Sequence, residues 1–212
     1  MENYILAAIF FAVAYLIGCF NLAYILGKRR NMDIRKKGSG NPGASNAMTT
    51  MGWVAGIAVG AADIFKAAIP IFAVRMIFAD AQIIWIAVAV GCIIGHMYPV
   101  TLGFRGGKGL ACLVGVYFAL NPLACLIAAL LIVIITLVTD YIALATILLA
   151  IAFPVFTYFT SGEYAIVATC LASVVAACMV IKHIGNIKRM INGTEIGLRK
   201  ASSGKYRSNG EK

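Results

Sequence analysis

Long apolar segments dominate the chain, and short polar segments separate them. Stretches such as Tyr4–Gly27 and Leu123–Val138 are apolar on every face of a helix. A helix needs about 20 such residues to cross a bilayer. The alternation of apolar and polar residues that marks the strands of a membrane barrel is absent. The pattern therefore predicts an all-α, polytopic membrane helix bundle.

The order of these segments predicts seven transmembrane helices, with six as the fallback. Asn121-Pro122 interrupts the long run Leu110–Val138, and proline begins a helix more readily than it continues one. A break at this point separates a short fourth span from a fifth. The expected spans are Tyr4–Gly27, Trp53–Phe78, Ile83–Tyr98, Leu110–Leu120, a fifth ending at Val138, Tyr141–Thr160 and Tyr164–Ile181.

The positive charges lie in two groups that orient the bundle. Residues 28–37 hold one group of lysines and arginines, and the segment from Lys182 to the C-terminus holds the other. Such clusters stay in the cytoplasm, so we expect a cytoplasmic C-terminus and an N-terminus outside. Only the break at Asn121-Pro122 gives this result, since one helix there would put the tail outside. Glu2 stands where a signal peptide has lysines, so the first span is expected to be uncleaved.

Composition limits the kind of partner. The chain is 62% hydrophobic and 12% charged, with a net charge of +10. A surface of that sign attracts anionic lipid headgroups and phosphorylated metabolites, and its placement beside membrane spans argues against nucleic acid. The six cysteines lie in or beside apolar spans without paired metal spacing, so we expect no metal or cofactor. Residues 1–199 are expected to form one membrane domain and 200–212 a disordered basic tail.

A glycine-rich turn near the middle of the chain is the first candidate for chemistry. The segment Gly95–Ala111 places Lys108 among three glycines, directly before an apolar helix. Glycines let backbone N–H groups crowd one point, and a helix N-terminus favours an anion. We interpret the turn as a phosphate cradle; the alternative is a tight basic turn between membrane helices. The residues concerned are Gly106, Gly107, Lys108 and Gly109.

A second glycine-rich segment, residues 38–46, carries short hydrogen-bonding side chains. It fits the pattern G-x-G-x-x-G, but no strand precedes it, which excludes a dinucleotide site. Its side chains suit phosphate or carbonyl oxygens; alternatively, the segment is a solvated loop that caps the next helix. The candidate binding residues are Ser39, Asn41, Gly43, Ser45 and Asn46.

Two further groups of polar residues follow helical spacing. His183, Asn186 and Arg189 are three residues apart and share one helix face, which suits a phosphorylated substrate. Asp63 and Lys66 are also three apart, inside a membrane span, where charges pair or serve a site. On the predicted topology the two glycine-rich segments and His183 all emerge on the cytoplasmic side. They are therefore expected to form one site.

Together these residues resemble the bacterial family of membrane acyl-phosphate:glycerol-3-phosphate acyltransferases. The matching stretches are Ser39–Asn46, Asp63–Lys66, Gly95–Pro99 with Phe104–Gly109, and His183–Arg189 through Gly193–Glu195. The resemblance implies seven spans in the bacterial inner membrane. It also implies transfer of a fatty acyl group from acyl phosphate to the sn-1 hydroxyl of glycerol 3-phosphate, which gives lysophosphatidate.

The resemblance also assigns roles to individual residues. Ser39, His183 and Asn186 match residues important for catalysis, the glycines around Lys108 match a phosphate-binding loop, and Glu195 matches a glutamate needed for structural integrity. Asp63, Lys66 and His96 are expected to support the site. Thr49 departs from the family, which has an arginine there. This departure leaves two alternatives open, a divergent paralogue with another acceptor and a lipid-sensing protein without activity. A transporter of phosphorylated anions is a further alternative.

Overall fold

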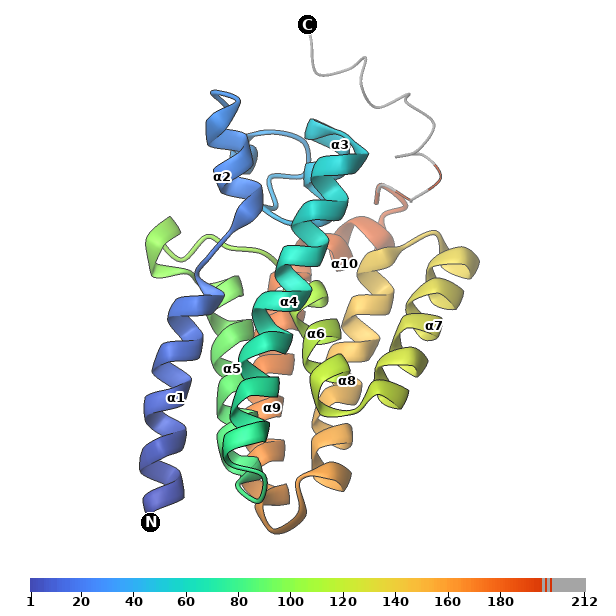
Figure 1. Ribbon diagram of the computed structural model, residues 1–212. Coiled ribbons are helices and arrows are strands. Elements are labelled where there is room, and N and C mark those ends of the chain that lie inside the picture. The colour runs from blue at the N-terminus through green and yellow to red at the C-terminus, as the bar shows by residue number, and fades with distance from the viewer. Residues whose placement is uncertain (196, 198, 200–212) are drawn as a thin grey trace, which may run out of the picture.

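The chain folds into a bundle of helices, as the computed structural model in Figure 1 shows. The structure describes residues 1–195, 197 and 199, and these contain no β-strand. The helices are α1 (Glu2–Gly18), α2 (Leu22–Arg29), α3 (Ala44–Met51), α4 (Trp53–Ile77), α5 (Gln82–Met97), α6 (Leu110–Leu120), α7 (Pro122–Thr139), α8 (Ile142–Thr160), α9 (Ala165–Lys182) and α10 (Ile184–Ile191). Three short 3-10 helices, η1 (Ile34–Lys36), η2 (Val100–Leu102) and η3 (Gly162–Tyr164), lie in the connections.

The expectation of an integral, multi-pass helical protein is confirmed. Within the described residues, six helical segments are long and apolar enough to cross a membrane, and α6 is a shorter apolar helix of 11 residues. The expected break falls at Asn121, whose side chain accepts the N–H of Ala124 at 3.0 Å and so caps α7. The count of seven crossings and the orientation stay predictions. The tail 200–212 lies outside the described residues.

The first expected span, Tyr4–Gly27, falls within one segment that could cross a membrane, Glu2–Arg29, but its helix is interrupted, and this corrects the expectation of a continuous helix. α1 ends at Gly18, and α2 begins at Leu22 after a turn at Cys19 and an extended conformation at Asn21. Asn21 causes the break because its side chain caps α2 through the N–H of Tyr24 and donates to the carbonyl of Pro42 at 2.9 Å. An asparagine inside an apolar run is the signal that the sequence offered for this break.

A small helical subdomain stands above the bundle, and part of it is formed by residues 28–50, which we expected to be a loop. It consists of α2, η1 and α3, beside the upper end of α4 (Figure 1). Its separate apolar core is formed by the buried side chains of Ala23, Ile34, Ala47 and Val59. This core holds the loop of residues 30–43, which we call the first loop, in a fixed shape.

Glycines let the central helices approach closely. Gly91 and Gly95 lie one turn apart on α5, and a methyl group added at Gly91 would be 2.6 Å from the carbonyl oxygen of Phe11 in α1. Gly115 of α6 meets the backbone of Ile64 in α4 in the same way. Small residues at such spacing allow backbone-to-backbone packing in membranes, where burial from water supplies little attraction between helices. These contacts fix α1, α4, α5 and α6 around the polar residues described next.

Candidate active site

A buried group of three charged or polar side chains lies among α1, α4 and α5. The Lys66 ammonium donates to the Asp63 carboxylate at 2.7 Å and lies 2.9 Å from Nδ1 of His96. It also donates to the carbonyl of Phe20, at the break between α1 and α2, at 2.8 Å. We call Asp63, Lys66 and His96 the buried triad. The expected pairing of Asp63 with Lys66 is present, and His96 joins it although nothing in the sequence spacing connects residues 63 and 96.

The buried triad has the wrong charge for a metal ion. Asp63, His96 and Cys112 present ligand atoms within 4.8 Å of one another, the spacing of a cation site. Lys66, however, already places its ammonium against both Asp63 and His96. A metal ion there would have to displace a buried positive charge that satisfies the carboxylate. We therefore interpret the triad as an internal ion pair that needs no further cation.

The glycine turn, residues 103–109, folds back onto the C-terminal turn of α5. The N–H groups of Gly106 and Gly107 donate to the carbonyls of Met97 and His96 at 3.2 and 3.1 Å. The imidazole of His96 lies directly against Gly107, so that a methyl group there would collide with Nε2 of the ring. These two glycines are thus required for packing, and their N–H groups are not available to an anion. This differs from the expected cradle.

The N-terminus of α6 is the open part of the turn. Gly109 precedes the helix at φ 94°, a left-handed conformation that favours glycine, and provides no side-chain cap. The first helical N–H groups, at Leu110, Ala111 and Cys112, donate to no carbonyl within the described part of the chain. An anion binds readily to such a terminus. Within this turn, the start of α6 and the ammonium of Lys108 are therefore the groups that could hold an anion.

Lys108 connects the glycine turn to α10. Its ammonium donates to the side-chain oxygen of Asn186, whose amide nitrogen donates in turn to Glu195 at 2.7 Å. The other oxygen of Glu195 accepts from the guanidinium of Arg189 at 2.7 Å. Four of the expected site residues therefore form one continuous chain of hydrogen bonds. Glu195 fixes the orientation of Asn186, and so of Lys108.

His183 lies at the junction of α9 and α10, at 2% exposure. Its Nδ1 lies 2.7 Å from the carbonyl oxygen of Met179. A carbonyl can only accept, so Nδ1 carries the proton and Nε2 keeps a free lone pair in the neutral ring. Burial lowers the pKa of His183, the bond to Met179 raises it, the nearby Lys108 lowers it and Glu195 raises it, with a lower pKa as the net result. The ring is therefore neutral at pH 7 and able to accept a proton.

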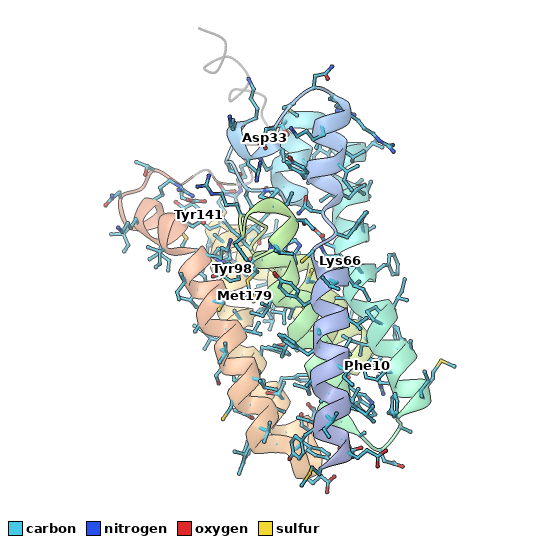
Figure 2. All side chains as sticks on the ribbon, turned by 90° about the vertical axis from the view of Figure 1, so that its left-hand side faces the viewer. Phe10, Asp33, Lys66, Tyr98, Tyr141 and Met179 are labelled. Carbon is cyan, nitrogen blue, oxygen red and sulfur yellow. The ribbon has the colours of Figure 1, made fainter. Side chains whose placement is uncertain are left out.

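Lys108 is also perturbed. Burial lowers the pKa of Lys108 to about 8, against the opposing effect of Glu195 and with help from Arg189 and Lys182. A partly buried ammonium with a single side-chain acceptor is poorly compensated. An incoming phosphate would provide the missing negative charge. Figure 2 shows that Lys66, Tyr98 and Met179, which mark the triad, the end of α5 and the partner of His183, lie at a similar level of the bundle.

The first loop is built around Asn46, which is 2% exposed. Its amide oxygen accepts the N–H of Ser39 at 2.9 Å, and its amide nitrogen donates to the carbonyls of Ile34 and Lys37. The side chain is fully used inside the protein. Asn46 thus shapes the loop, and it has no donor left for the ligand that we expected it to bind.

The side chains of the other candidates, in the first loop and in the first turn of α3, remain accessible. Ser39 and Ser45 are exposed, Asn41 is partly exposed, and buried Gly43 precedes α3 without a side-chain cap. The hydroxyl of Ser39 accepts the N–H of Asn41 at 3.5 Å. Thr49 is exposed, and its hydroxyl donates to the carbonyl of Asn46. The start of α3 is therefore a second helix N-terminus with a glycine before it.

The first loop contacts η2, directly before the glycine turn. The guanidinium of Arg35 donates to the carbonyl of Leu102 at 3.0 Å and to Asp33 at 2.9 Å. The hydrogen bond from Arg35 lowers the pKa of Asp33 to about 2. Sequence reasoning missed this link, for which the spacing gave no signal. The first loop, the glycine turn and α10 all lie toward the end of the bundle opposite the N-terminus (Figure 1).

Comparison with known proteins gives one consistent result. The pattern that defines the family of glycerol-3-phosphate acyltransferases matches residues 8–193. A glycerol-3-phosphate acyltransferase of Geobacter sulfurreducens is 38% identical over 186 residues, which are 87% of this chain and 93% of that protein. One from Thermoanaerobacter sp. is 39% identical over 186 residues, which are 86% and 91% of the two chains.

Solved structures agree in fold. PlsY, an integral membrane glycerol 3-phosphate acyltransferase, is similar in its glycerol 3-phosphate form with a TM-score of 0.82 and 33% identity, over 91% of this chain and 95% of that one. Its lysophosphatidic acid form gives a TM-score of 0.79 at 32% identity, over 90% and 94% of the two chains.

Proposed function

Because the chain belongs to the glycerol-3-phosphate acyltransferase family, we propose that it moves a fatty acyl group from acyl phosphate to the sn-1 hydroxyl of glycerol 3-phosphate. The products are lysophosphatidate and inorganic phosphate. The bond from Lys108 to Asn186, beside the open N-terminus of α6, is the observation that carries this proposal. It places a cation, an amide and unpaired N–H groups where a phosphate would bind.

The donor requires mainly positioning. An acyl phosphate is a mixed anhydride whose leaving group is a stable phosphate, so no covalent enzyme intermediate is needed. Lys108 and the first N–H groups of α6 hold that phosphate and neutralise charge as the bond breaks. The acyl chain extends sideways into the lipid between helices. Lys108 and the first N–H groups of α6 thus both bind the acyl phosphate and stabilise its leaving phosphate.

The acceptor, glycerol 3-phosphate, must lose the proton of its sn-1 hydroxyl, either to a base of the protein or to a phosphate oxygen of the substrate. Neutral His183 takes the proton of the sn-1 hydroxyl through Nε2, since Nδ1 is held by Met179. In the alternative, a phosphate oxygen of the substrate accepts the proton, and His183 only orients the hydroxyl. Asn186 aligns the donor phosphate through Lys108. Ser39, Asn41, Ser45 and Arg189 hold the acceptor, and Gly43 leaves the start of α3 open to it.

The site faces the cytoplasm in the bacterial inner membrane. The positively charged first loop and the positive residues of α10 lie at the same end of the molecule, as expected for a cytoplasmic face (Figure 1). Glycerol 3-phosphate enters from water at that face, and the acyl donor enters from the lipid. The positive charge at this surface attracts both substrates.

The test is an assay of purified protein with acyl phosphate and radiolabelled glycerol 3-phosphate. Labelled lysophosphatidate is the expected product, and acyl-CoA in place of acyl phosphate serves as the donor control. Folded protein that forms no product would exclude the activity. Uptake of label into proteoliposomes without chemical change would instead indicate a transporter. The Thr49→Arg variant then measures what the family's arginine contributes, and we expect it to lower KM for glycerol 3-phosphate.

A further inference from the structure

The buried triad is close to the site: Asp63 and His96 present ligand atoms within 4.8 Å of the thiol of Cys112, in the first turn of α6. Asp63, Lys66 and His96 are 2%, 8% and 3% exposed, and Lys66 divides its donors between Asp63, the carbonyl of Phe20 and the ring of His96. A charged cluster of this kind is costly to bury, and charges inside a membrane span commonly pair or serve a site. Its contacts show what it holds in place.

His96 supports the glycine turn in two ways. Its carbonyl accepts the N–H of Gly107 at 3.1 Å, and its ring fills the space where a side chain at residue 107 would lie. The residue that follows is Lys108, whose ammonium reaches α10. The ring orientation of His96 is set in turn by Lys66, 2.9 Å from Nδ1, and by Asp63 at 3.3 Å.

We propose that His96, oriented by Asp63 and Lys66, is a positioning residue that fixes the glycine turn and thereby presents Lys108 to substrate phosphate. This inference rests on the proposed function. It also gives a reason for the buried charges, because one ammonium ties together the break between α1 and α2, α4 and the end of α5. If only apolar side chains surrounded the ring of His96, the ring could rotate and the glycine turn could shift along α5.

The decisive variant is His96→Asn in the full-length protein. Asparagine keeps a polar group near the position of Nδ1 for Lys66, but it lacks the ring that supports Gly107. We expect KM for glycerol 3-phosphate or acyl phosphate to rise at least about tenfold while kcat changes little. We also expect the alkaline fall in kcat/KM to move to higher pH, since a loosened turn exposes Lys108 to water and returns its pKa toward the ordinary lysine value.

The groups that face Lys108 are the same in this variant and in the wild type. They are Asn186, Arg189 and Glu195 from α10 and the segment after it, with Lys182 and His183 from the end of α9. None of these groups is changed by the substitution. A shift of the alkaline fall in kcat/KM would therefore result from a change in the glycine turn. A loss of folding alone would lower the amount of active enzyme and leave both KM and the alkaline limb in place.

A second variant tests the steric contact without touching the triad. Gly107→Ala places a methyl group against the ring of His96 and should also raise KM about tenfold. In Gly107→Ala/His96→Ala the obstacle is gone, so we expect the double variant to be no worse than the poorer single variant. Additive losses in KM would overturn the proposal.

Arg75→Met is the matched control, because it removes a partly buried cation from the other end of α4. It should lower the melting temperature without moving KM or the alkaline limb. Wild-type protein without activity would defeat the proposed function, whereas active wild type with an unchanged His96→Asn profile would defeat only this inference.

Discussion

Two side chains at the site, Lys108 and His183, are held in complementary states by the same environment. Burial lowers the pKa of both, which leaves His183 neutral and Lys108 charged at pH 7 but titrating near pH 8. A neutral imidazole beside an ammonium can accept a proton while the ammonium binds phosphate. Glu195 accepts hydrogen bonds from Asn186 and Arg189, and its negative charge partly compensates the positive charges of Arg189 and Lys108.

The binding of phosphate should weaken above pH 8. In the proposed function, Lys108 binds phosphate as the ammonium, which is present below its pKa of about 8 and is lost as the pH rises through that value. The substrate phosphate stays dianionic over this range because its second pKa is about 6. We expect KM to rise by up to about tenfold per pH unit above the midpoint. Steady-state kinetics between pH 6.5 and about 9.5 measure this. Lys108→Arg, which stays charged, should lack the alkaline rise, and a flat wild-type profile would contradict the assignment.

Two substitutions of His183 separate a base from an orienting group. His183→Asn keeps a donor for the carbonyl of Met179 and removes Nε2, whereas His183→Gln keeps a polar group near the position of Nε2. If Nε2 takes the proton, both variants lose about 10²–10⁴-fold in kcat. If the substrate phosphate takes it, His183→Gln retains most of kcat. Initial rates at saturating substrate decide between the two readings of the mechanism.

Among the elements, α6 depends on partners at both of its ends. It is 11 residues long, and its C-terminal carbonyls, at Ala119 and Leu120, accept from the guanidinium of Arg75. The same guanidinium lies over the ring of Trp85 at 5.0 Å. Arg75 therefore caps α6 from α4 and neutralises the negative end of its dipole.

Removal of this cap should cost stability and leave catalysis intact. We expect Arg75→Met to destabilise the fold by about 1.5–3 kcal/mol, the range for a hydrogen bond to a charged group. Arg75→Lys, with one donor group in place of the fork, should be intermediate. Thermal unfolding in detergent gives the order of the three proteins. Equal melting temperatures for wild type and Arg75→Met would show that α6 needs no cap from α4.

Packing between α1 and α5 offers a second test at this scale. Gly91→Ala puts a methyl group 2.6 Å from the carbonyl oxygen of Phe11, a contact that only backbone movement can relieve. We expect destabilisation of about 1–3 kcal/mol, as for other overpacked sites. Gly60→Ala in α4 is the control, since its methyl group would lie 3.5 Å from Ala44 and only the gain in helix propensity remains. Melting temperatures that fall equally in both variants would refute the packing argument.

At the scale of the whole molecule, the sequence patterns predicted the positions of helices better than they predicted contacts between distant residues. Apolar length and Asn121-Pro122 located α4 to α9 within a residue or two, because these features act locally. The break at Asn21 depends on Pro42, and the triad depends on His96, so both required the folded chain. Residue type alone could not distinguish a ligand-binding amide from a loop-forming one. Asn46 is the example, since its partners are carbonyls that only the fold brings near it.

The number of membrane crossings is the remaining prediction for the whole chain. α6 spans only about 16 Å at 1.5 Å per residue, against about 30 Å of hydrocarbon. Seven crossings require that it nevertheless complete a crossing, and the glycine turn starts α6 beside the C-terminal turn of α5, through the bonds of Gly106 and Gly107 to Met97 and His96. Seven crossings place the two termini on opposite sides, and six place them on the same side. We expect a fluorescent protein that matures only in the cytoplasm to be bright when fused after Lys212, and alkaline phosphatase to be active in the turn at Ala79. A dark C-terminal fusion on active enzyme, together with inactive alkaline phosphatase at Ala79, would show the opposite orientation, and the proposed cytoplasmic site would then have to be abandoned.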